Sequence, residues 1–225
     1  MLGKMNLNMY CSKDKNEIRE TIVDSAIKYG CKHMLTMAGE RGVDAKMFSE
    51  RLRSARIVSV EEDADVFEFQ QKELLQFRNT TCLNVKLSDF LNSGISMFSP
   101  FDCVFFDYYC LYKKQVEHDV ESLFSCGRFA RDGVFAITLA KAHERPEFLK
   151  GTRLLSGVCC NNYHDYVSNK EGCIDTTMHQ IARDHGINLK QIMQKSYRNT
   201  KTGSSVGATT MMVFIYKTTN RKGKR

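Results

Sequence analysis

The residues from His33 to Gly42 constrain the fold of this chain most strongly. An apolar run over residues 34–37 stops at Gly39, Gly42 follows three residues later, and apolar residues then recur at helical spacing from Met47 onward. The pattern predicts a strand, a tight turn and a helix, the unit by which a parallel α/β sheet lets backbone approach a nucleotide. Glycine suits the turn because it tolerates positive φ and brings no Cβ into the ligand's space. The spacing is G-x-x-G, however, so an ordinary strand-to-helix turn is the simpler interpretation of this stretch alone.

Apolar runs of strand length alternate with helical patterns along the rest of the chain. Five strands are expected at residues 32–37, 56–60, 81–87, 101–106 and 134–139, followed by a hairpin of 188–198 and 209–217. Helices are expected between them, with Asp14 beginning the first and Asp175 beginning the last. Asp132-Gly133 is expected to turn into the fifth strand, and residues 140–174 show no regular pattern. This alternation predicts a mostly parallel sheet with right-handed crossovers and an antiparallel strand from the final hairpin.

Size and composition favour one globular domain. The chain has 225 residues, of which 42% are hydrophobic, and only two prolines, so a proline-rich linker is not expected. We expect an N-terminal extension over 1–13, a domain over 14–218 and a basic tail over 219–225. No apolar run approaches the roughly 20 residues that cross a bilayer, and the first eight residues are too short and polar for a secretory signal. The expected location is therefore intracellular, in the cytoplasm or nucleus.

The charge balance suggests the kind of partner. The net charge is +7, and the last six residues include four that are Lys or Arg. This balance favours a polyanion, nucleic acid first. A solvated tail that aids solubility explains the terminal residues equally well.

The nine cysteines are expected to be reduced thiols, because no secretory signal accompanies them. A zinc site would have to be assembled from residues that lack C-x-x-C or H-x-x-x-H spacing, namely Cys159, Cys160, His164, Cys173 and His179. No metal site is therefore expected.

Acidic residues follow three successive predicted strands. Glu61 comes after the second strand, Asp89 after the third, and Asp107 ends the fourth. An acid just past the second strand is placed to accept hydrogen bonds from both ribose hydroxyls of a nucleoside. Asp89 with Phe90 suits an adenine edge, because a carboxylate can meet the exocyclic amine while an apolar ring covers the base. Each acid could instead cap the next helix, as we expect of Asp63.

With this series of acids behind a glycine turn, residues 14–218 resemble the class I S-adenosylmethionine-dependent methyltransferases. The resemblance implies a Rossmann-like three-layer sandwich, with a seven-stranded, mostly parallel sheet of order 3-2-1-4-5-7-6 and an antiparallel last strand. It also implies S-adenosylmethionine as the cofactor, bound by Ala38, Gly39, Glu40, Gly42, Glu61, Asp89, Phe90 and Asp107. The glycine turn would pass under the methionine part, Glu61 would hold the ribose, and Asp89 with Phe90 would hold the adenine.

The resemblance further implies a catalytic face. Asp107-Tyr108-Tyr109-Cys110 is similar to the Asp-Pro-Pro-Tyr signature of amino-group DNA and RNA methyltransferases, without the two prolines. Asp107 would accept hydrogens from a target amine, and Tyr108 or Tyr109 would stack on an extruded base. Packing at the strand end is an equally good interpretation of the tyrosines.

Two further positions depart from family patterns. Thr36 and Met37 stand where the family usually has an acid, and Glu40 is the candidate to replace it. A ribose 2′-O-methyltransferase would want a lysine at the end of strand five, where Thr138 stands, with Lys141 three residues away.

Three functions therefore remain open. The first is a methyltransferase acting on RNA or DNA, supported by the acids, the basic charge, and Arg198, Lys201 and Lys217 of the hairpin. The second is a catalytically inactive methyltransferase-like binding module or subunit of a nucleic-acid-processing complex, which the irregular glycine turn favours. The third, a dinucleotide-dependent oxidoreductase, is disfavoured by the absence of G-x-G-x-x-G and by the terminal hairpin.

Overall fold

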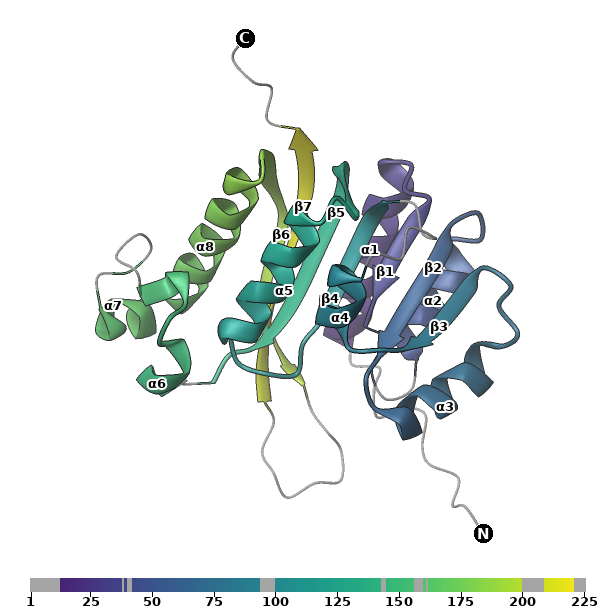
Figure 1. The fold of residues 1–225 in the computed structure, drawn as a ribbon, viewed down its shortest axis with the longest axis horizontal. Coiled ribbons are helices and arrows are strands. Elements are labelled where there is room, and N and C mark those ends of the chain that lie inside the picture. Colours follow the sequence, from purple (N-terminus) through teal and green to yellow (C-terminus); the bar gives the residue numbers. More distant parts are fainter. Residues whose placement is uncertain are drawn as a thin grey trace.

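A central seven-stranded sheet carries helices on both faces (Figure 1). The computed structural model describes residues 13–37, 39, 42–93, 100–142, 145–155, 160, 162–199 and 209–220. The strands are β1 His33–Thr36, β2 Arg56–Glu61, β3 Thr80–Asn84, β4 Phe101–Asp107, β5 Phe129–Ala140, β6 Ile187–Asn199 and β7 Thr209–Asn220. The helices are α1 Lys13–Lys28, α2 Val43–Arg51, α3 Ala64–Leu74, α4 Leu87–Asn92, α5 Lys114–Ser125, α6 Pro146–Leu149, η2 Arg153–Leu155, α7 Tyr163–Ser168 and α8 Lys170–Asp184.

The strand order is β3-β2-β1-β4-β5-β7-β6, as predicted. β1 pairs in parallel with β2 and β4, so that Met34 lies between Ile57 and Cys103. β7 runs antiparallel to both β5 and β6, which makes it the reversed strand of the sheet. The carboxyl ends of β1, β2 and β4 therefore meet at one edge, next to the point where the strand order reverses.

Two apolar layers cover the sheet, because successive side chains of a strand point to opposite faces. Along β4, Val104 and Phe106 pack in the layer under α4, α5 and α8. Cys103 and Phe105 pack in the layer under α1 and α2. These β4 residues are almost completely buried, and burying a side chain such as phenylalanine stabilises a fold by about 1.5–3 kcal/mol. The arrangement confirms the predicted three-layer sandwich.

Strand three is shorter than predicted. It ends at Asn84 rather than near residue 87, and the following residues form α4. Leu87, Phe90 and Leu91 are buried on one face of this helix, at a spacing of three and four residues. The prediction was wrong because this apolar run is short, and periodicity over so few residues does not separate a strand end from a single helical turn.

Three other expectations were wrong. Gly133 does not turn but lies inside β5, where a Cβ would collide with the backbone of Asp102. Asp175 does not begin the last helix, since α8 starts at Lys170 and Asp175 accepts a hydrogen bond from Tyr216 at 2.8 Å. The segment 140–174 contains the helical elements α6, η2 and α7 in its described parts.

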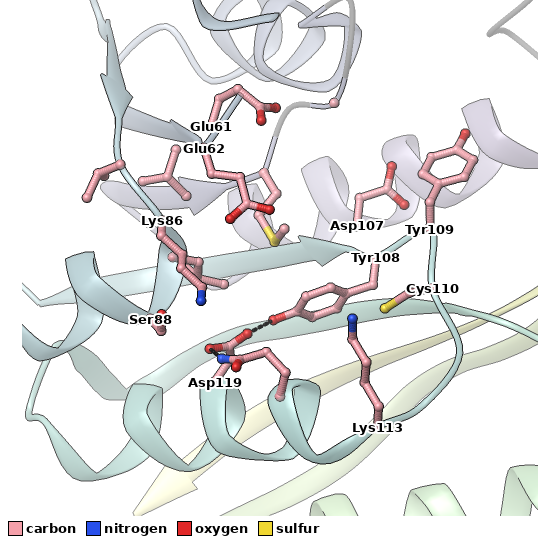
Figure 2. Close-up of a pocket in the computed structure, with 16 residues that line it drawn as sticks. Glu61, Glu62, Lys86, Ser88, Asp107, Tyr108, Tyr109, Cys110, Lys113 and Asp119 are labelled. Carbon is pink, nitrogen blue, oxygen red and sulfur yellow. Dashed lines mark hydrogen bonds between the residues drawn. The ribbon is translucent and has the colours of Figure 1, made fainter. Parts of the chain in front are cut away.

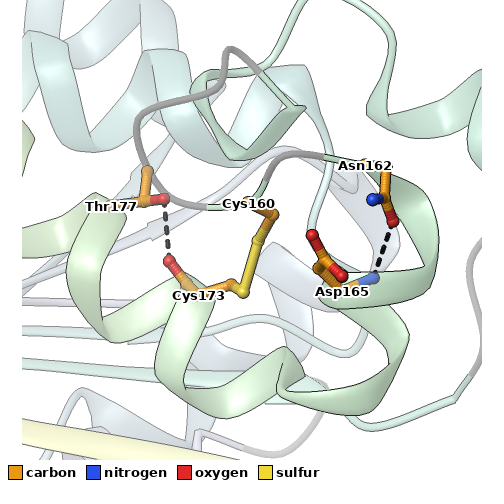
Figure 3. Close-up of a disulfide and its surroundings, with 5 residues drawn as sticks. All are labelled: Cys160, Asn162, Asp165, Cys173 and Thr177. Atoms are coloured by element: carbon orange, nitrogen blue, oxygen red, sulfur yellow. Dashed lines mark hydrogen bonds between the residues drawn. A yellow bond between two sulfur atoms is a disulfide. The ribbon is translucent and has the colours of Figure 1, made fainter.

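Two of the nine cysteines are paired, contrary to the expectation of reduced thiols. A disulfide joins Cys160 to Cys173 of α8, with the Cα atoms 6.4 Å apart (Figure 3). That separation lies within the range disulfides require, and the sequence spacing alone could not show it. Cys31, Cys82, Cys103, Cys110 and Cys126 are free thiols. In the described parts of the chain, no helix is long and apolar enough to cross a membrane.

Candidate functional site

A pocket of about 380 Å³ opens at the carboxyl ends of β1, β2 and β4 (Figure 2). Its walls come from the glycine turn, from the end of β2 at Glu61 and Glu62, from the segment after β3, and from the end of β4 and the residues that follow it. In Figure 2, Asp107 and Tyr109 lie at one end of the pocket, and Ser88 and Asp119 at the other. The volume falls within the range of small-molecule sites, about 300–1,000 Å³.

The glycine turn forms the first wall. Gly39 and Gly42 have φ values of +61° and +60°, which other residues adopt only with strain. The Gly42 amide donates to the Gly39 carbonyl at 3.1 Å and closes the turn. Gly39 lines the pocket, and Gly42 lies behind it, where a Cβ would come within 3.4 Å of Leu74. Ala38 and Glu40, also predicted to bind the cofactor, lie outside the described residues.

Glu61 lies at the end of β2 and faces the pocket half-buried. Its Oε1 accepts a hydrogen bond from the amide of Asp63 at 2.9 Å, and its Oε2 lies 3.4 Å from Nε2 of Gln70. A carboxylate offers about four lone-pair positions, so Glu61 retains the capacity to accept further hydrogen bonds. Asp63 caps α3 as predicted, accepting from the amides of Asp65 and Val66.

Asp89 and Phe90 do not line the pocket. Asp89 is exposed on α4, and Phe90 is buried with its ring centroid 6.0 Å from that of Phe101. Because β3 ends three residues earlier than predicted, the segment Val85–Ser88 lines the pocket in their place. Lys86 of this segment points into the pocket towards Asp119 of α5 (Figure 2).

Asp107 ends β4 with a side chain that is only 1% exposed. Its Oδ2 accepts a hydrogen bond from the Lys15 ammonium of α1 at 2.8 Å, and its Oδ1 accepts one from the Thr138 hydroxyl of β5. Burial lowers the pKa of Lys15, but the negative charges of Asp107 and Asp44, together with Tyr109, outweigh that effect and raise the pKa well above its usual range. Lys15 and Asp107 therefore form a buried ion pair.

The two tyrosines after Asp107 have different environments. Tyr108 is 8% exposed and donates its hydroxyl to Asp119 at 2.7 Å. Burial and the carboxylate of Asp119 raise the pKa of Tyr108 well above its usual range. Tyr109 is 47% exposed, and its hydroxyl accepts a hydrogen bond from Lys15 at 3.1 Å. Of the two, only Tyr109 presents a ring that a planar ligand could cover.

No protein-family model and no curated protein matches the sequence. Solved structures do match. A precorrin-6y C5,15-methyltransferase from Geobacter metallireducens has a TM-score of 0.52 and 14% identity, over 89% of this chain and 87% of that one. The N-methyltransferase NodS from Bradyrhizobium japonicum has a TM-score of 0.53 and 10% identity, over 92% and 97%. An rRNA methylase from Streptococcus thermophilus has a TM-score of 0.55 and 10% identity, over 93% and 99%.

The chain has the class I methyltransferase fold. The similarity of the chain to three methyltransferase structures and its strand order confirm the expected fold. On this methyltransferase fold, three of the acids and glycines predicted to act together, Gly39, Glu61 and Asp107, line one pocket. Among the residues that the structure covers, no three His, Cys, Asp or Glu side chains come together as metal ligands would.

Sequence reasoning missed two buried polar residues that support this pocket of the methyltransferase fold. Gln70 of α3 is completely buried and donates to the Gly39 carbonyl at 2.5 Å. Lys15 holds Asp107, as described above. A signal was present for both, because each polar residue occupies an apolar face: Gln70 lies four residues before Leu74, and Lys15 three residues before Ile18.

Two of the basic residues predicted in the hairpin, Arg198 and Lys217, lie at opposite ends of it. Arg198 lies near the end of β6, at the edge that carries the pocket. Lys217 lies at the opposite end of the hairpin, paired with Lys190 and with its ammonium 4.3 Å from the ring centroid of Tyr29. Lys201 lies outside the described residues.

Proposed function

We propose that the chain is an S-adenosylmethionine-dependent methyltransferase that acts on nucleic acid. The observation that carries the proposal is the convergence of Gly39, Glu61 and Asp107, from the ends of three strands, on one pocket. That edge of a parallel sheet is where nucleotide-like ligands bind.

The donor and acceptor groups of the pocket fit the cofactor. Glu61 would accept hydrogen bonds from the ribose hydroxyls, and the glycine turn would approach the methionine part. We assign the adenine end to Val85–Ser88 rather than to Asp89 and Phe90, because only the former segment lines the pocket. There, Asp119 would accept from the exocyclic amine and Lys86 would donate to a ring nitrogen, the pattern an adenine edge requires.

The cofactor would supply an activated methyl group with a neutral leaving group, so little acid–base help is needed. The contribution of the chain would be alignment of the target atom and exclusion of water. Asp107 and Tyr109 lie at the end of the pocket where the target would approach (Figure 2). The exposed ring of Tyr109 would stack on a base, and Asp107 retains lone pairs beyond those used by Lys15 and Thr138.

Three observations favour a nucleic-acid substrate. The net charge of +7 favours a polyanion. Arg198 lies at the same edge of the sheet as the pocket. One structure with the same fold is named an rRNA methylase. Tyr109 would provide a stacking surface in the pocket.

Two assays test the proposal. Calorimetry with S-adenosylmethionine, S-adenosylhomocysteine and NAD is expected to show binding of the first two only. Transfer of a tritiated methyl group is then measured on panels of RNA, DNA and protein, with Asp107→Ala and Tyr109→Ala as variants whose folding is checked by circular dichroism. The proposal is supported if the wild type transfers the label to RNA or DNA and both variants lose this activity. Absence of cofactor binding overturns it and leaves an inactive binding module, whereas label in protein alone overturns the substrate class.

A further inference from the structure

We propose that Lys15 of α1 is a positioning residue of the pocket, which neutralises Asp107 and fixes Tyr109 at the methyl-transfer end. This inference rests on the proposed function, because it assumes that the reacting sulfur lies near Asp107. Lys15 itself does not line the pocket and would act through the two residues that do.

Lys15 contacts both of those residues. Its ammonium lies 2.8 Å from Oδ2 of Asp107, 3.1 Å from the hydroxyl of Tyr109, and 4.8 Å from the centroid of the Tyr109 ring. The residue is 5% exposed, so water hardly screens these charges. Lys15 therefore contacts both the charged group and the exposed ring at this end of the pocket.

Attachment of α1 to the sheet does not depend on Lys15 alone. One helical turn later, Arg19 donates to Asp44 of α2 at 2.5 Å in a second buried ion pair. At the surface, Lys195 of β6 lies 2.8 Å from both Asp14 and Glu17 of α1. A buried ion pair contributes little net stability, because desolvation of both charges offsets their attraction. The distinctive effect of the Lys15–Asp107 pair is thus on the pocket.

The charge of the cofactor makes this effect measurable. S-adenosylmethionine carries a positive sulfonium, whereas S-adenosylhomocysteine carries a neutral thioether. With Lys15 in place, Asp107 belongs to a neutral pair and favours the sulfonium only weakly. Without Lys15, the carboxylate would attract the sulfonium more strongly, and the affinity ratio of the two ligands would move towards S-adenosylmethionine by about tenfold.

Calorimetry at pH 8 with both ligands tests this ratio in four proteins besides the wild type. Lys15→Met is expected to raise the ratio about tenfold, and Lys15→Arg, which keeps the charge, is expected to restore it. Lys195→Met is the matched control, because it removes another lysine that holds α1 without contacting Asp107. The double variant Lys15→Met/Asp107→Asn removes both charges, so it leaves no unpaired buried carboxylate, in contrast to Lys15→Met. Its affinity ratio is expected not to exceed that of the wild type.

A second measurement needs no cofactor. With 3-fluorotyrosine at position 109, the ¹⁹F resonance is expected to move in Lys15→Met and to stay in place in Lys195→Met. Equal loss of affinity for both ligands in Lys15→Met, a raised ratio in the double variant, or an unmoved resonance would each overturn the inference. A wild-type protein that binds neither ligand overturns the proposed function instead, and the fluorine measurement still decides whether Lys15 positions Tyr109.

Discussion

The side-chain amide of Gln70 lies 2.5 Å from the carbonyl oxygen of Gly39. The same nitrogen lies 3.4 Å from Oε2 of Glu61, and the amide oxygen of Gln70 accepts a hydrogen bond from Ser59 at 3.3 Å. A single buried side chain of α3 therefore connects the glycine turn after β1 to the acid that ends β2. It fixes the separation of the two walls between which a nucleoside would lie.

Replacing Gln70 by alanine should loosen the glycine turn. The carbonyl of Gly39 would lose its donor, and a lost buried hydrogen bond costs about 1–3 kcal/mol. We expect the affinity for S-adenosylhomocysteine to fall about tenfold, measured by calorimetry. The neighbouring Gln71 is exposed, so Gln71→Ala should bind as the wild type does. Equal binding by Gln70→Ala would show that the turn holds its shape without this bridge.

Glu61→Gln tests the assignment of the ribose contact. The amide keeps the size of the side chain but removes the charge, and hydrogen bonds to charged groups contribute about 1.5–3 kcal/mol. Affinities for S-adenosylmethionine and S-adenosylhomocysteine should both fall by about 10–100-fold, because the ribose is common to them. Glu68→Gln, an exposed change on α3, serves as the control. A loss confined to one ligand would contradict the ribose contact.

The fold could be predicted from the sequence because its long elements have clear patterns. β4 is an almost continuous apolar run of strand length, α5 repeats apolar residues at helical spacing, and the connector before β7 marks a hairpin. Short or hidden elements could not be predicted. α4 occupies six residues, too few to show a helical period. The continuation of β5 through Gly133 depends on a close backbone contact with Asp102, which sequence does not reveal.

The candidate site was predictable only where the end of the preceding strand was predicted accurately. Glu61 and Asp107 follow directly from strands whose ends were placed within one residue, and both line the pocket. Asp89 was assigned from a strand end placed three residues too late, so its position relative to the pocket was missed. The support of Asp107 by Lys15 joins residues 92 positions apart, and only the folded chain brings them together.

Glu171 should make stability depend on pH. Burial raises its pKa, but hydrogen bonds from Lys141, Ser196 and Gln194 outweigh that effect and lower the pKa to about 2. Because the folded pKa lies below the unfolded one, this group stabilises the fold above about pH 4.5 and loses that contribution as the pH falls towards 2. With the side chain about a quarter exposed, we expect about 1 kcal/mol after screening.

Urea unfolding at pH 6 and pH 3 measures this contribution. Glu171→Gln should lose about 1 kcal/mol less stability than the wild type between these two values. Glu147→Gln, an exposed carboxylate on α6, should behave as the wild type. Parallel losses in all three proteins would mean that the network around Glu171 contributes nothing.

The disulfide should stabilise the segment that precedes α8. The cross-link joins residues 13 positions apart, and loops of this size contribute about 3 kcal/mol in the chain-entropy model. We expect the variant Cys160→Ser/Cys173→Ser to unfold at lower urea concentration, and Cys126→Ser, which changes a free exposed thiol, to match the wild type. Peptide mapping under non-reducing conditions should recover the two cysteines linked. Recovery of both as free thiols would contradict the bond.

The reversed direction of β7 has a practical consequence. Because this strand starts at the edge that carries the pocket and finishes at Asn220 on the far edge, a tether that follows the strand would be attached on the side of the sheet opposite the opening. Protein captured on a sensor surface through such a tether would present its binding side to the bulk solution, so that long polyanions could reach it without steric interference from the support.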